Sequence, residues 1–532
     1  MKKQDFIVLF CFLILGVILV LSRGQEASWD LANYHYYNAW AFLHNRIGYD
    51  VMPCGLQSYM NPLLDVPFYV LVKLFNNYPR LIMAIQSSHY SISLFLVYLI
   101  AKELFKQNNK LKFLIISFVI FIAALDFHSI AELGSTFNDL PISIFILTAL
   151  LIIIKNLFLE NSRKRTINIS VAGLLIGVAA GLKASALFFF VSILLSVICF
   201  SRSYTKPLKI ISLFSVCFAL GYLLTNGWWM YIVYSHFKNP FFPYMNQIFK
   251  SPLAWIWSYA DERYLPRTTL QYLIYPLCFN RDFYVTELWH RDFRHAFLFF
   301  SFFFIVIGNF IIPKFNSSFK EKLSKEIDLT SVNFLTVVLF FSYIIWLNTS
   351  GVLRYMLPLC LIEGIFITQF LLYFKIIFSE KLFEKIVLGV VLFLILTTEY
   401  VPLNHTRIEY QDKFFDFPDL KIPDNANVFI FRGYPISVFI PFQNPKAKYH
   451  MIFSTAFNDY DYYFLNEEKE KLKELSKQKN TYILLSSVKG IADLNYSIVS
   501  EYVDLRDYSC KQVVPAKFSL YPVVKFCHRK DE

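Results

Sequence analysis

A carboxylate, two amides and two phenols follow the first apolar segment of the chain. Residues 6–22 are almost wholly apolar, and a helix of this length can cross a bilayer. If the helix continues beyond them, five polar side chains share one of its faces: Asp30, Asn33, Tyr34, Tyr37 and Asn38. Hydrogen-bonding groups and aromatic rings on one surface suit a polyhydroxylated ligand. The alternative is an interfacial helix whose tyrosines belong to the aromatic belt of the membrane.

A second carboxylate occupies an equivalent position further along the chain. Asp139 follows Asn138 at the start of the apolar segment 140–159. One of the two carboxylates could accept a proton from an acceptor hydroxyl, and we expect Asp30 to be this base. Asp139 and Asn138 could orient the acceptor, or Asp30 and Asp139 could hold a divalent cation such as Mg²⁺ or Mn²⁺. Asp139 also suits the N-cap of the helix that follows, and the two roles are compatible.

Two basic side chains interrupt apolar sequence where turns are expected. Lys183 is the only charged residue in the run 167–200, which is too long for one membrane span and suits two. Arg354 precedes the apolar segment 356–374, next to Tyr355. Arg and Lys are the side chains that bind phosphate oxygens, so both are candidates to bind a phosphate leaving group. The alternative is that they contact lipid headgroups.

Together these residues predict sugar transfer from a lipid-linked donor. A sugar on polyprenyl phosphate is already activated, so the reaction needs one carboxylate base and positive charge at the phosphate. A single in-line displacement would invert the anomeric centre. Inverting glycosidases use two carboxyl groups, an acid and a base, and here only the base would be needed.

The composition identifies a polytopic membrane protein. The 532 residues are 56% hydrophobic and only 17% charged, and the mean hydropathy is +0.45. A soluble chain is nearer to 25% charged. The formal charge of +12 lies in short loops between apolar segments, which is a pattern of membrane topology and not of a nucleic-acid-binding surface.

We predict a fold with about eleven transmembrane helices and a small extracytoplasmic α/β domain at the C-terminus. The predicted spans are residues 6–22, 78–101, 111–125, 140–159, 167–180, 184–200, 210–226, 296–312, 331–347, 356–374 and 386–400. The membrane domain is predicted to cover residues 1–403, with outer loops at 23–77 and 227–295, and the soluble domain to cover residues 404–532. With a cytoplasmic N-terminus, every basic cluster between spans falls inside, so Asp30, Asp139, Lys183 and Arg354 fall outside. Cys510 and Cys527 would then lie in an oxidising compartment and could form a disulfide.

The placement of these residues resembles the GT-C superfamily of polytopic glycosyltransferases, which includes protein O-mannosyltransferases and the aminoarabinose transferases of lipid A. The resemblance is carried by Asp30 after the first span, Asn138-Asp139 before the fourth, the Lys183 turn and the segment Arg354-Tyr355-x-Leu357-Pro358. The resemblance covers nearly the whole chain, and it consists of the positions of these residues relative to the spans and not of one continuous motif. The stretches 239–243 (Asn-Pro-Phe-Phe-Pro) and 289–292 (Trp-His-Arg-Asp) look like those of uncharacterised bacterial members. Asp30 is followed by Leu31, so the paired acid of other members is missing and the need for a metal stays open.

The resemblance implies a hexosyl- or pentosyltransferase in a bacterial inner membrane. It would use a polyprenyl-phosphate sugar and an acceptor that is a lipid, a glycan or a protein. We expect the substrate to contact the following side chains: Asn33, Tyr34, Tyr37, Asn61, Tyr355, Arg291 and Asp292.

Two other functions fit part of the pattern. A transporter or flippase of lipid-linked sugars would place its polar groups near the membrane midplane, whereas here they gather at one edge. An outer-face glycan polymerase or ligase would use similar chemistry with a glycan donor. A scaffold without activity would leave Asp30, Asp139 and Arg354 unexplained.

Overall fold

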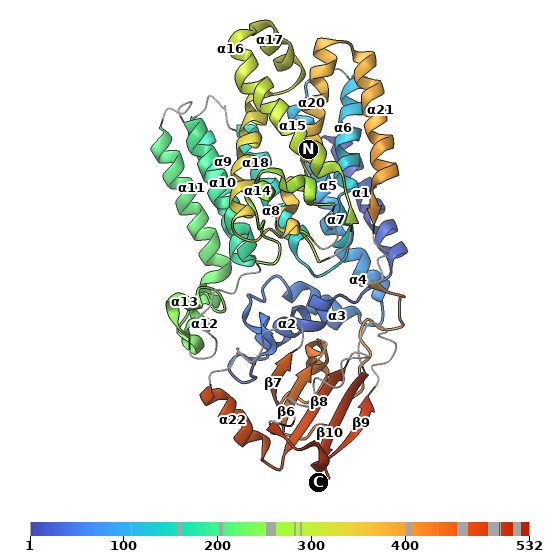
Figure 1. Ribbon diagram of the computed structural model, residues 1–532, viewed down its shortest axis with the longest axis vertical. Coiled ribbons are helices and arrows are strands. Elements are labelled where there is room, and N and C mark those ends of the chain that lie inside the picture. The colour runs from blue at the N-terminus through green and yellow to red at the C-terminus, as the bar shows by residue number, and fades with distance from the viewer. Residues whose placement is uncertain are drawn as a thin grey trace.

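The apolar segments form a helical bundle in the computed structural model (Figure 1). The structure describes residues 2–107, 109–156, 162–201, 206–251, 262–280, 284–287, 290–400, 407–432, 435–454, 466–487, 500, 502–513 and 523–530. The main helices of the bundle are α1 (Lys3–Arg23), α4 (Pro79–Gln86), α5 (Ser88–Leu104), α6 (Asn109–Ala124), α8 (Asp139–Asn156), α9 (Ser162–Leu182), α10 (Leu187–Phe200), α11 (Pro207–Tyr222), α15 (Arg294–Val306), α18 (Leu329–Leu347), α20 (Glu363–Ile377) and α21 (Glu380–Thr397).

Helices of this bundle are long and apolar enough to make the chain a multi-pass membrane protein. Within the described ranges, seven helices could cross a membrane by length and composition. An eighth crossing would combine η8 (Leu353–Met356) and α19 (Leu357–Cys360) with α20, which are bent by 54° at a short break. Each of the segments that the sequence predicts as a span contains helix, but some of these helices are shorter than a crossing requires. The number of eleven crossings therefore stays a prediction.

Local sequence explains where several helices begin and end. Pro207 occupies the first turn of α11, where its missing N–H costs no hydrogen bond. Ser379 caps α21 by accepting a hydrogen bond from the Leu382 N–H. Lys183 lies between α9 and α10, followed by the short helix η3 (Ala184–Ala186), so the predicted turn in the run 167–200 is present.

A segment of short elements lies below the bundle in Figure 1, between the bundle and a β-sheet. Its elements are β1 (Gln25–Glu26), η1 (Leu31–His35), α2 (Tyr36–Leu43), β2 (Pro53–Leu56), η2 (Gln57–Tyr59) and α3 (Val66–Phe75). Further short elements follow other helices: α7 (Phe127–Ala131), α12 (Trp228–Phe237), α13 (Asn246–Phe249), α14 (Thr269–Ile274), β3 (His290–Arg291), α16 (Ile312–Phe315) and α17 (Ser317–Glu326).

The C-terminal part contains a five-stranded sheet and one helix. The strand order is β7-β6-β8-β10-β9, in which β6 runs parallel to β7 and β8, and β10 runs antiparallel to β8 and β9. The elements are β6 (Asn427–Arg432), β7 (Lys448–Ser454), α22 (Asn466–Ser476), β8 (Thr481–Ser487), β9 (Tyr508–Val513) and β10 (Val523–Arg529). The predicted domain boundary at 403/404 lies outside the described residues.

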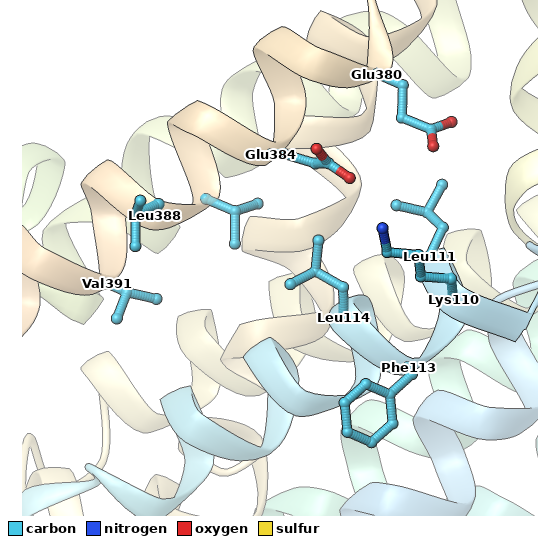
Figure 2. A pocket seen from close by; sticks show the side chains of 9 residues that line it. Lys110, Leu111, Phe113, Leu114, Glu380, Glu384, Leu388 and Val391 are labelled. Carbon is cyan, nitrogen blue, oxygen red and sulfur yellow. The ribbon is translucent and has the colours of Figure 1, made fainter.

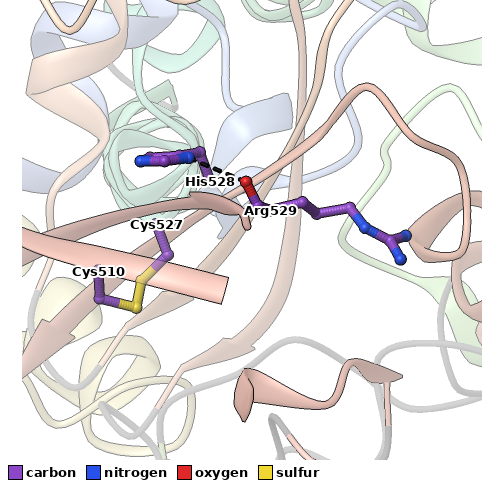
Figure 3. The surroundings of a disulfide bond; sticks show 4 residues. All are labelled: Cys510, Cys527, His528 and Arg529. Atoms are coloured by element: carbon purple, nitrogen blue, oxygen red, sulfur yellow. Dashed lines mark hydrogen bonds between the residues drawn. A yellow bond between two sulfur atoms is a disulfide. The ribbon is translucent and has the colours of Figure 1, made fainter. Parts of the chain in front are cut away.

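A disulfide joins the last two strands (Figure 3). Cys510 in β9 and Cys527 in β10 are register partners, and their sulfur atoms are 2.05 Å apart. Cys510 and Cys527 are the two cysteines that the sequence predicts to form a disulfide, and the structure confirms this prediction.

The sheet contacts the segment after α2 through its edge strand. The backbone N–H of Val51 donates to the Tyr449 carbonyl at 2.9 Å, and the Met451 N–H donates to the Val51 carbonyl at 2.9 Å. Arg46 forms an ion pair with Asp50 and donates to the Ala447 carbonyl at 2.7 Å. The sheet and the segment 24–76 are therefore joined by backbone and side-chain hydrogen bonds.

At the opposite end of the bundle, a groove separates the first turns of α6 and α21 (Figure 2). Lys110, Glu380 and Glu384 line one part of it, and apolar side chains such as Leu114 and Leu388 line the rest.

Candidate active site

Arg354 lies between three acidic side chains from different parts of the chain. Its Nη1 atom is 3.8 Å from Asp30 Oδ2 and 3.6 Å from Asp139 Oδ2, and its Nη2 atom is 3.3 Å from Glu287 Oε1. The Arg354 side chain is 17% exposed and that of Asp30 is 15% exposed, so both can be reached from outside the protein. Asp139 is almost fully buried. The structure thus brings together Asp30, Asp139 and Arg354, which are far apart in sequence.

The position of Arg354 follows from the turn before it. Gly351 has a φ of +65°, and a Cβ atom there would lie 2.0 Å from the Tyr264 carbonyl oxygen, so only glycine fits. The Leu353 N–H donates to the Val285 carbonyl at 2.8 Å. This bond holds the Arg354 turn against the loop that carries Glu287.

Lys183 forms a second cationic group on the other side of Asp139. Its Nζ atom forms an ion pair with Asp139 Oδ1 and donates to the Phe137 carbonyl at 2.8 Å. The Tyr355 ring lies near both cations, with its centroid 5.5 Å from Lys183 Nζ and 5.3 Å from the Arg354 guanidinium carbon. Two cations, two carboxylates and an aromatic ring therefore converge, as the sequence predicts for a sugar phosphate.

The stretch after Asp30 is not a regular α-helix. Residues Leu31–His35 form the π-helix η1, in which each turn contains an additional residue. The α-helical face expected from the sequence is therefore wrong beyond the first turn. Tyr34 and His35 lie near enough to Asp30 for its charge to raise the pKa of both, whereas Tyr37 donates to Asp50 at 2.7 Å.

Burial gives Asp30 the properties of a base. Loss of water around the carboxylate raises the pKa of Asp30, and the positive charge of Arg354 opposes this effect without cancelling it. A carboxylate with a raised pKa accepts a proton more readily near neutral pH than an exposed one.

A buried hydrogen-bond chain lies beside Asp30. His35 Nδ1 is 2.7 Å from Asp65 Oδ1, and Asn138 Nδ2 donates to the same oxygen at 2.7 Å. Burial lowers the pKa of His35, but the adjacent Asp65 charge and hydrogen bond outweigh it, so the net shift is upward. Asn138 has a φ of +69°, a conformation that asparagine tolerates better than most residues. Asn138 therefore connects Asp65 to the first turn of α8, and its role is to position Asp139.

Glu132 is a functional candidate that the sequence analysis missed. Its Oε2 atom accepts the Leu140 N–H at 3.1 Å, so Glu132, and not Asp139, satisfies a free N–H at the start of α8. Burial raises the pKa of Glu132 well above its usual value, and the charge of Asp139 raises it further. Glu132 could have been found by the reasoning that identified Asp139, because it too is a carboxylate in the loop 126–139.

Glu26 connects the Asp30 segment to the loop that carries Asp139. Its Oε1 atom accepts hydrogen bonds from Ser28 Oγ and from both the N–H and the hydroxyl of Thr136, each at 2.9 Å. Arg407 lies nearby and donates to the carbonyls of Ala131 (3.3 Å) and Leu133. Arg407, the first residue of β5 (Arg407–Ile408), thus supports the loop that leads to Asp139.

Other residues predicted to bind substrate have structural contacts instead. Asn61 Nδ2 donates to the carbonyls of Gly181 (3.0 Å) and Thr225 (2.9 Å), so it holds the turn before Lys183. Tyr37 is 2% exposed, and Asn33 is fully buried within η1. Contact of these three side chains with a substrate stays a prediction.

Arg291 and Asp292 also lie in other contacts. Arg291 is paired with Glu399 at 3.5 Å between β3 and β4 (Glu399–Tyr400). Asp292 is fully buried and forms an ion pair with Arg294, whose charge lowers the pKa of Asp292 despite its burial. Trp289, from the same predicted stretch, lies outside the described residues.

The fold of the chain is similar to that of a solved structure. Over 98% of its length, the chain superposes on 97% of a crystal structure of ArnT from Cupriavidus metallidurans in the apo state, with a TM-score of 0.51 and 11% sequence identity. No protein-family model matches the sequence, and no curated protein matches it. At this identity the likeness concerns the fold alone.

Proposed function

We propose that this protein is an inverting glycosyltransferase that moves a sugar from a polyprenyl-phosphate donor to an acceptor at the outer face of the membrane. The observation that carries the proposal is the position of Arg354, whose guanidinium lies 3.8 Å from Asp30 and 3.6 Å from Asp139. A base and a phosphate-binding cation are thereby held side by side. The GT-C-like fold supports the same class of reaction.

In the proposed reaction, Asp30 takes the proton of the acceptor hydroxyl. The hydroxyl oxygen forms a bond to the anomeric carbon as the bond from that carbon to the phosphate oxygen breaks. The phosphate leaves with the bonding electron pair, and Arg354 and Lys183 stabilise its negative charge. The Tyr355 ring, between the two cations, is placed to contact the sugar or the lipid phosphate.

A divalent cation between Asp30 and Asp139 is not required by this geometry. The Arg354 guanidinium occupies the space where an ion bridging the two carboxylates would be expected, and it already supplies positive charge there. We therefore propose that Arg354 takes the role that the sequence analysis left open to Mg²⁺ or Mn²⁺. Full transfer in a buffer without added Mg²⁺ or Mn²⁺ would agree with this assignment.

The proposed orientation places the candidate site and the β-sheet outside the cytoplasm. The helices α2 and α3, which follow Asp30 in the chain, lie between the bundle and the sheet (Figure 1). This polarity agrees with the distribution of basic loops in the sequence, which favours a cytoplasmic N-terminus.

Sugar transfer can be tested with purified protein in lipid nanodiscs and a panel of radiolabelled polyprenyl-phosphate sugars. A membrane extract would supply lipid, glycan and protein acceptors, and release of unglycosylated polyprenyl phosphate would be measured. We expect consumption of one donor by the wild type and by Asp416→Asn, an exposed carboxylate on the C-terminal side, but not by Asp30→Asn. Protein-dependent movement of an intact donor across a bilayer, without consumption, would contradict the proposal and identify a transporter.

A further inference from the structure

A second cluster of chemically active side chains lies outside the candidate active site, where α15 meets the broken helix α19/α20. We propose that His295, Cys360 and Glu363 form a zinc-binding site. One ligand atom from each residue lies within 4.8 Å of the others. Nothing in the sugar-transfer reaction uses these three residues.

The cluster is buried beside other charged groups. His295 is 3% exposed, Cys360 is 3% exposed and Glu363 is 2% exposed. Asp126 and Asp292 lie beside them fully buried, and one guanidinium, that of Arg294, pairs with both. The carboxylates of Asp126, Asp292 and Glu363 are thus buried together with two cationic partners, Arg294 and, in its ion pair with Glu363, His295.

An ion pair between His295 and Glu363 explains only part of this arrangement. His295 Nδ1 is 2.7 Å from Glu363 Oε1, so the two side chains are hydrogen-bonded without a metal. However, His295 Nε2 and Glu363 Oε2 are both buried and have no hydrogen-bond partner in the part of the chain that the structure describes. Buried polar atoms are rarely left without partners, and the thiol of Cys360 plays no part in the ion pair.

The ligand types favour zinc over other divalent cations. Thiolate, imidazole and carboxylate are the ligands of protein-bound Zn²⁺, whereas Mg²⁺ and Ca²⁺ prefer oxygen alone. Zinc bonds are about 2.0–2.3 Å long, so ligand atoms around a tetrahedral ion lie about 3.3–3.8 Å apart. The ligand atoms lie within 4.8 Å of one another, and the His295–Glu363 hydrogen bond would open to admit the ion. A water molecule would complete the four ligands.

Metal binding would be coupled to proton release. Cys360 would lose its thiol proton, and His295 would bind as the neutral imidazole, so the proton that it shares with Glu363 would leave as well. No oxidation or group transfer is involved.

The site would stabilise the break that follows Arg354. Cys360 ends α19 and Glu363 begins α20, and the two helices meet at a bend of 54°. His295 lies on the neighbouring helix α15, so a shared ion would join the two sides of the break to α15. Because η8, which carries Arg354, directly precedes α19, the ion would also limit movement of that turn.

The experiment measures metal content and uses the full-length chain in nanodiscs. Cys11 and Cys199 are exposed thiols that could bind metal on their own, so both are first changed to serine in the parent protein. After removal of metal with a chelator and dialysis against equal concentrations of Zn²⁺, Mn²⁺ and Mg²⁺, mass spectrometry of the elements gives the bound stoichiometry. We expect one Zn²⁺ per chain in the parent and at least a tenfold loss of affinity in Cys360→Ser.

Cys278→Ser is the matched control, since Cys278 is another buried cysteine. It should retain the ion. Replacement of zinc by Co²⁺ should produce a thiolate-to-cobalt absorption band in the parent and in Cys278→Ser, and Glu363→Gln should weaken cobalt binding if Cys360→Ser fails to fold. A parent protein without stoichiometric zinc, or a Cys360→Ser protein with unchanged zinc, would overturn the proposal. Either result leaves the proposed sugar transfer unaffected.

Discussion

At the scale of single residues, the candidate site depends on two carboxylates with different environments. Asp30 is partly exposed and faces Arg354, whereas Asp139 is buried and paired with both Lys183 and Arg354. A base has to reach the acceptor, and a paired carboxylate cannot easily leave its cations. The difference assigns proton transfer to Asp30 and leaves Asp139 to hold Lys183 and Arg354 in place.

We expect Asp30→Asn to lower kcat by about 10²–10⁴-fold, since general bases contribute rate factors of this size. The amide has nearly the same shape, so the thermal unfolding midpoint should change little. Turnover is measured with the donor that the wild type consumes. Full activity in Asp30→Asn would eliminate Asp30 as the base.

The raised pKa of Asp30 gives the reaction a defined pH dependence. The base must be ionised, so kcat/KM should fall as the pH decreases through the pKa of Asp30, and this fall should begin at a higher pH than for an exposed carboxylate. The profile is measured in nanodiscs between about pH 4 and 8, the range in which a carboxylate with an upward-shifted pKa titrates. Arg354→Gln removes a charge that favours ionisation, so it should move the fall to a still higher pH; a downward shift would contradict this electrostatic role.

Glu132 provides a test of stability. Its pKa in the folded protein lies well above 4.5, so the proton-bound form is favoured by folding. This contribution to stability is complete below the unfolded pKa and is lost as the pH rises through the folded pKa. Glu132→Gln mimics the protonated form and should therefore show a smaller loss of thermal stability between pH 5 and about pH 8 than the wild type. Glu132→Ala, which removes the acceptor of the Leu140 N–H, should be less stable at every pH.

At the scale of elements, turns and helix breaks decide which side chains meet. The π-helix η1 turns Tyr34 and His35 toward Asp30, and the turn at Gly351 brings Arg354 back to the same place. The turn between α9 and α10 is held from outside by Asn61, whose amide donates to the carbonyls of Gly181 and Thr225. Lys183 follows two residues later, so its position depends on this amide.

Removal of the Asn61 amide should therefore weaken donor binding. We expect Asn61→Ala to raise the KM for the lipid-linked sugar several-fold with a smaller effect on kcat, and to cost about 1 kcal/mol of stability through lost hydrogen bonds. Asn76→Ala is the matched control, because Asn76 makes comparable bonds to the backbone of Phe415, away from Lys183. An equal change of KM in both variants would assign a purely structural role to Asn61.

At the scale of the whole molecule, the C-terminal part both covers and supports the segment that contains Asp30. The sheet contacts that segment at Val51 and Arg46, and Arg407 supports the loop 131–136 near the site. These contacts connect the C-terminal part to two segments that lie more than 270 residues earlier in the chain. The C-terminal part is thus more than an attached helper, since buried apolar side chains of the bundle and of the sheet belong to one cluster.

Two truncations distinguish these contributions. A chain that ends at residue 403 loses both the sheet and Arg407, whereas a chain that ends at Phe417 loses the sheet and keeps Arg407. We expect the helical bundle to remain folded in both, as judged by circular dichroism and a monodisperse elution profile. The chain that ends at 403 should lose more activity, because Glu26 then lies buried without the nearby guanidinium charge. Loss of the bundle in both would show that the sheet is needed for folding.

The sequence by itself determined the features that depend on local composition. Long apolar segments predict membrane helices because a helix in lipid satisfies its backbone internally. Lys183 marked a turn because a lone charge does not remain at the centre of a span, and Cys510 and Cys527 are joined by a disulfide in the structure. Asp30, Asp139 and Arg354 were identified as candidates because charged side chains at the edge of a span require a partner or a function.

Only the tertiary structure decided which of these residues meet. Glu287 and the His35–Asp65 pair belong to the site through contacts between separate segments, and local patterns carry no information about such contacts. The face predicted for residues 30–38 was wrong because one π-helical turn changes the direction of every following side chain. Asn61, Tyr37 and Asp292 have the residue types of ligand-binding groups, but buried hydrogen bonds and ion pairs already occupy them, and this distinction depends on packing alone.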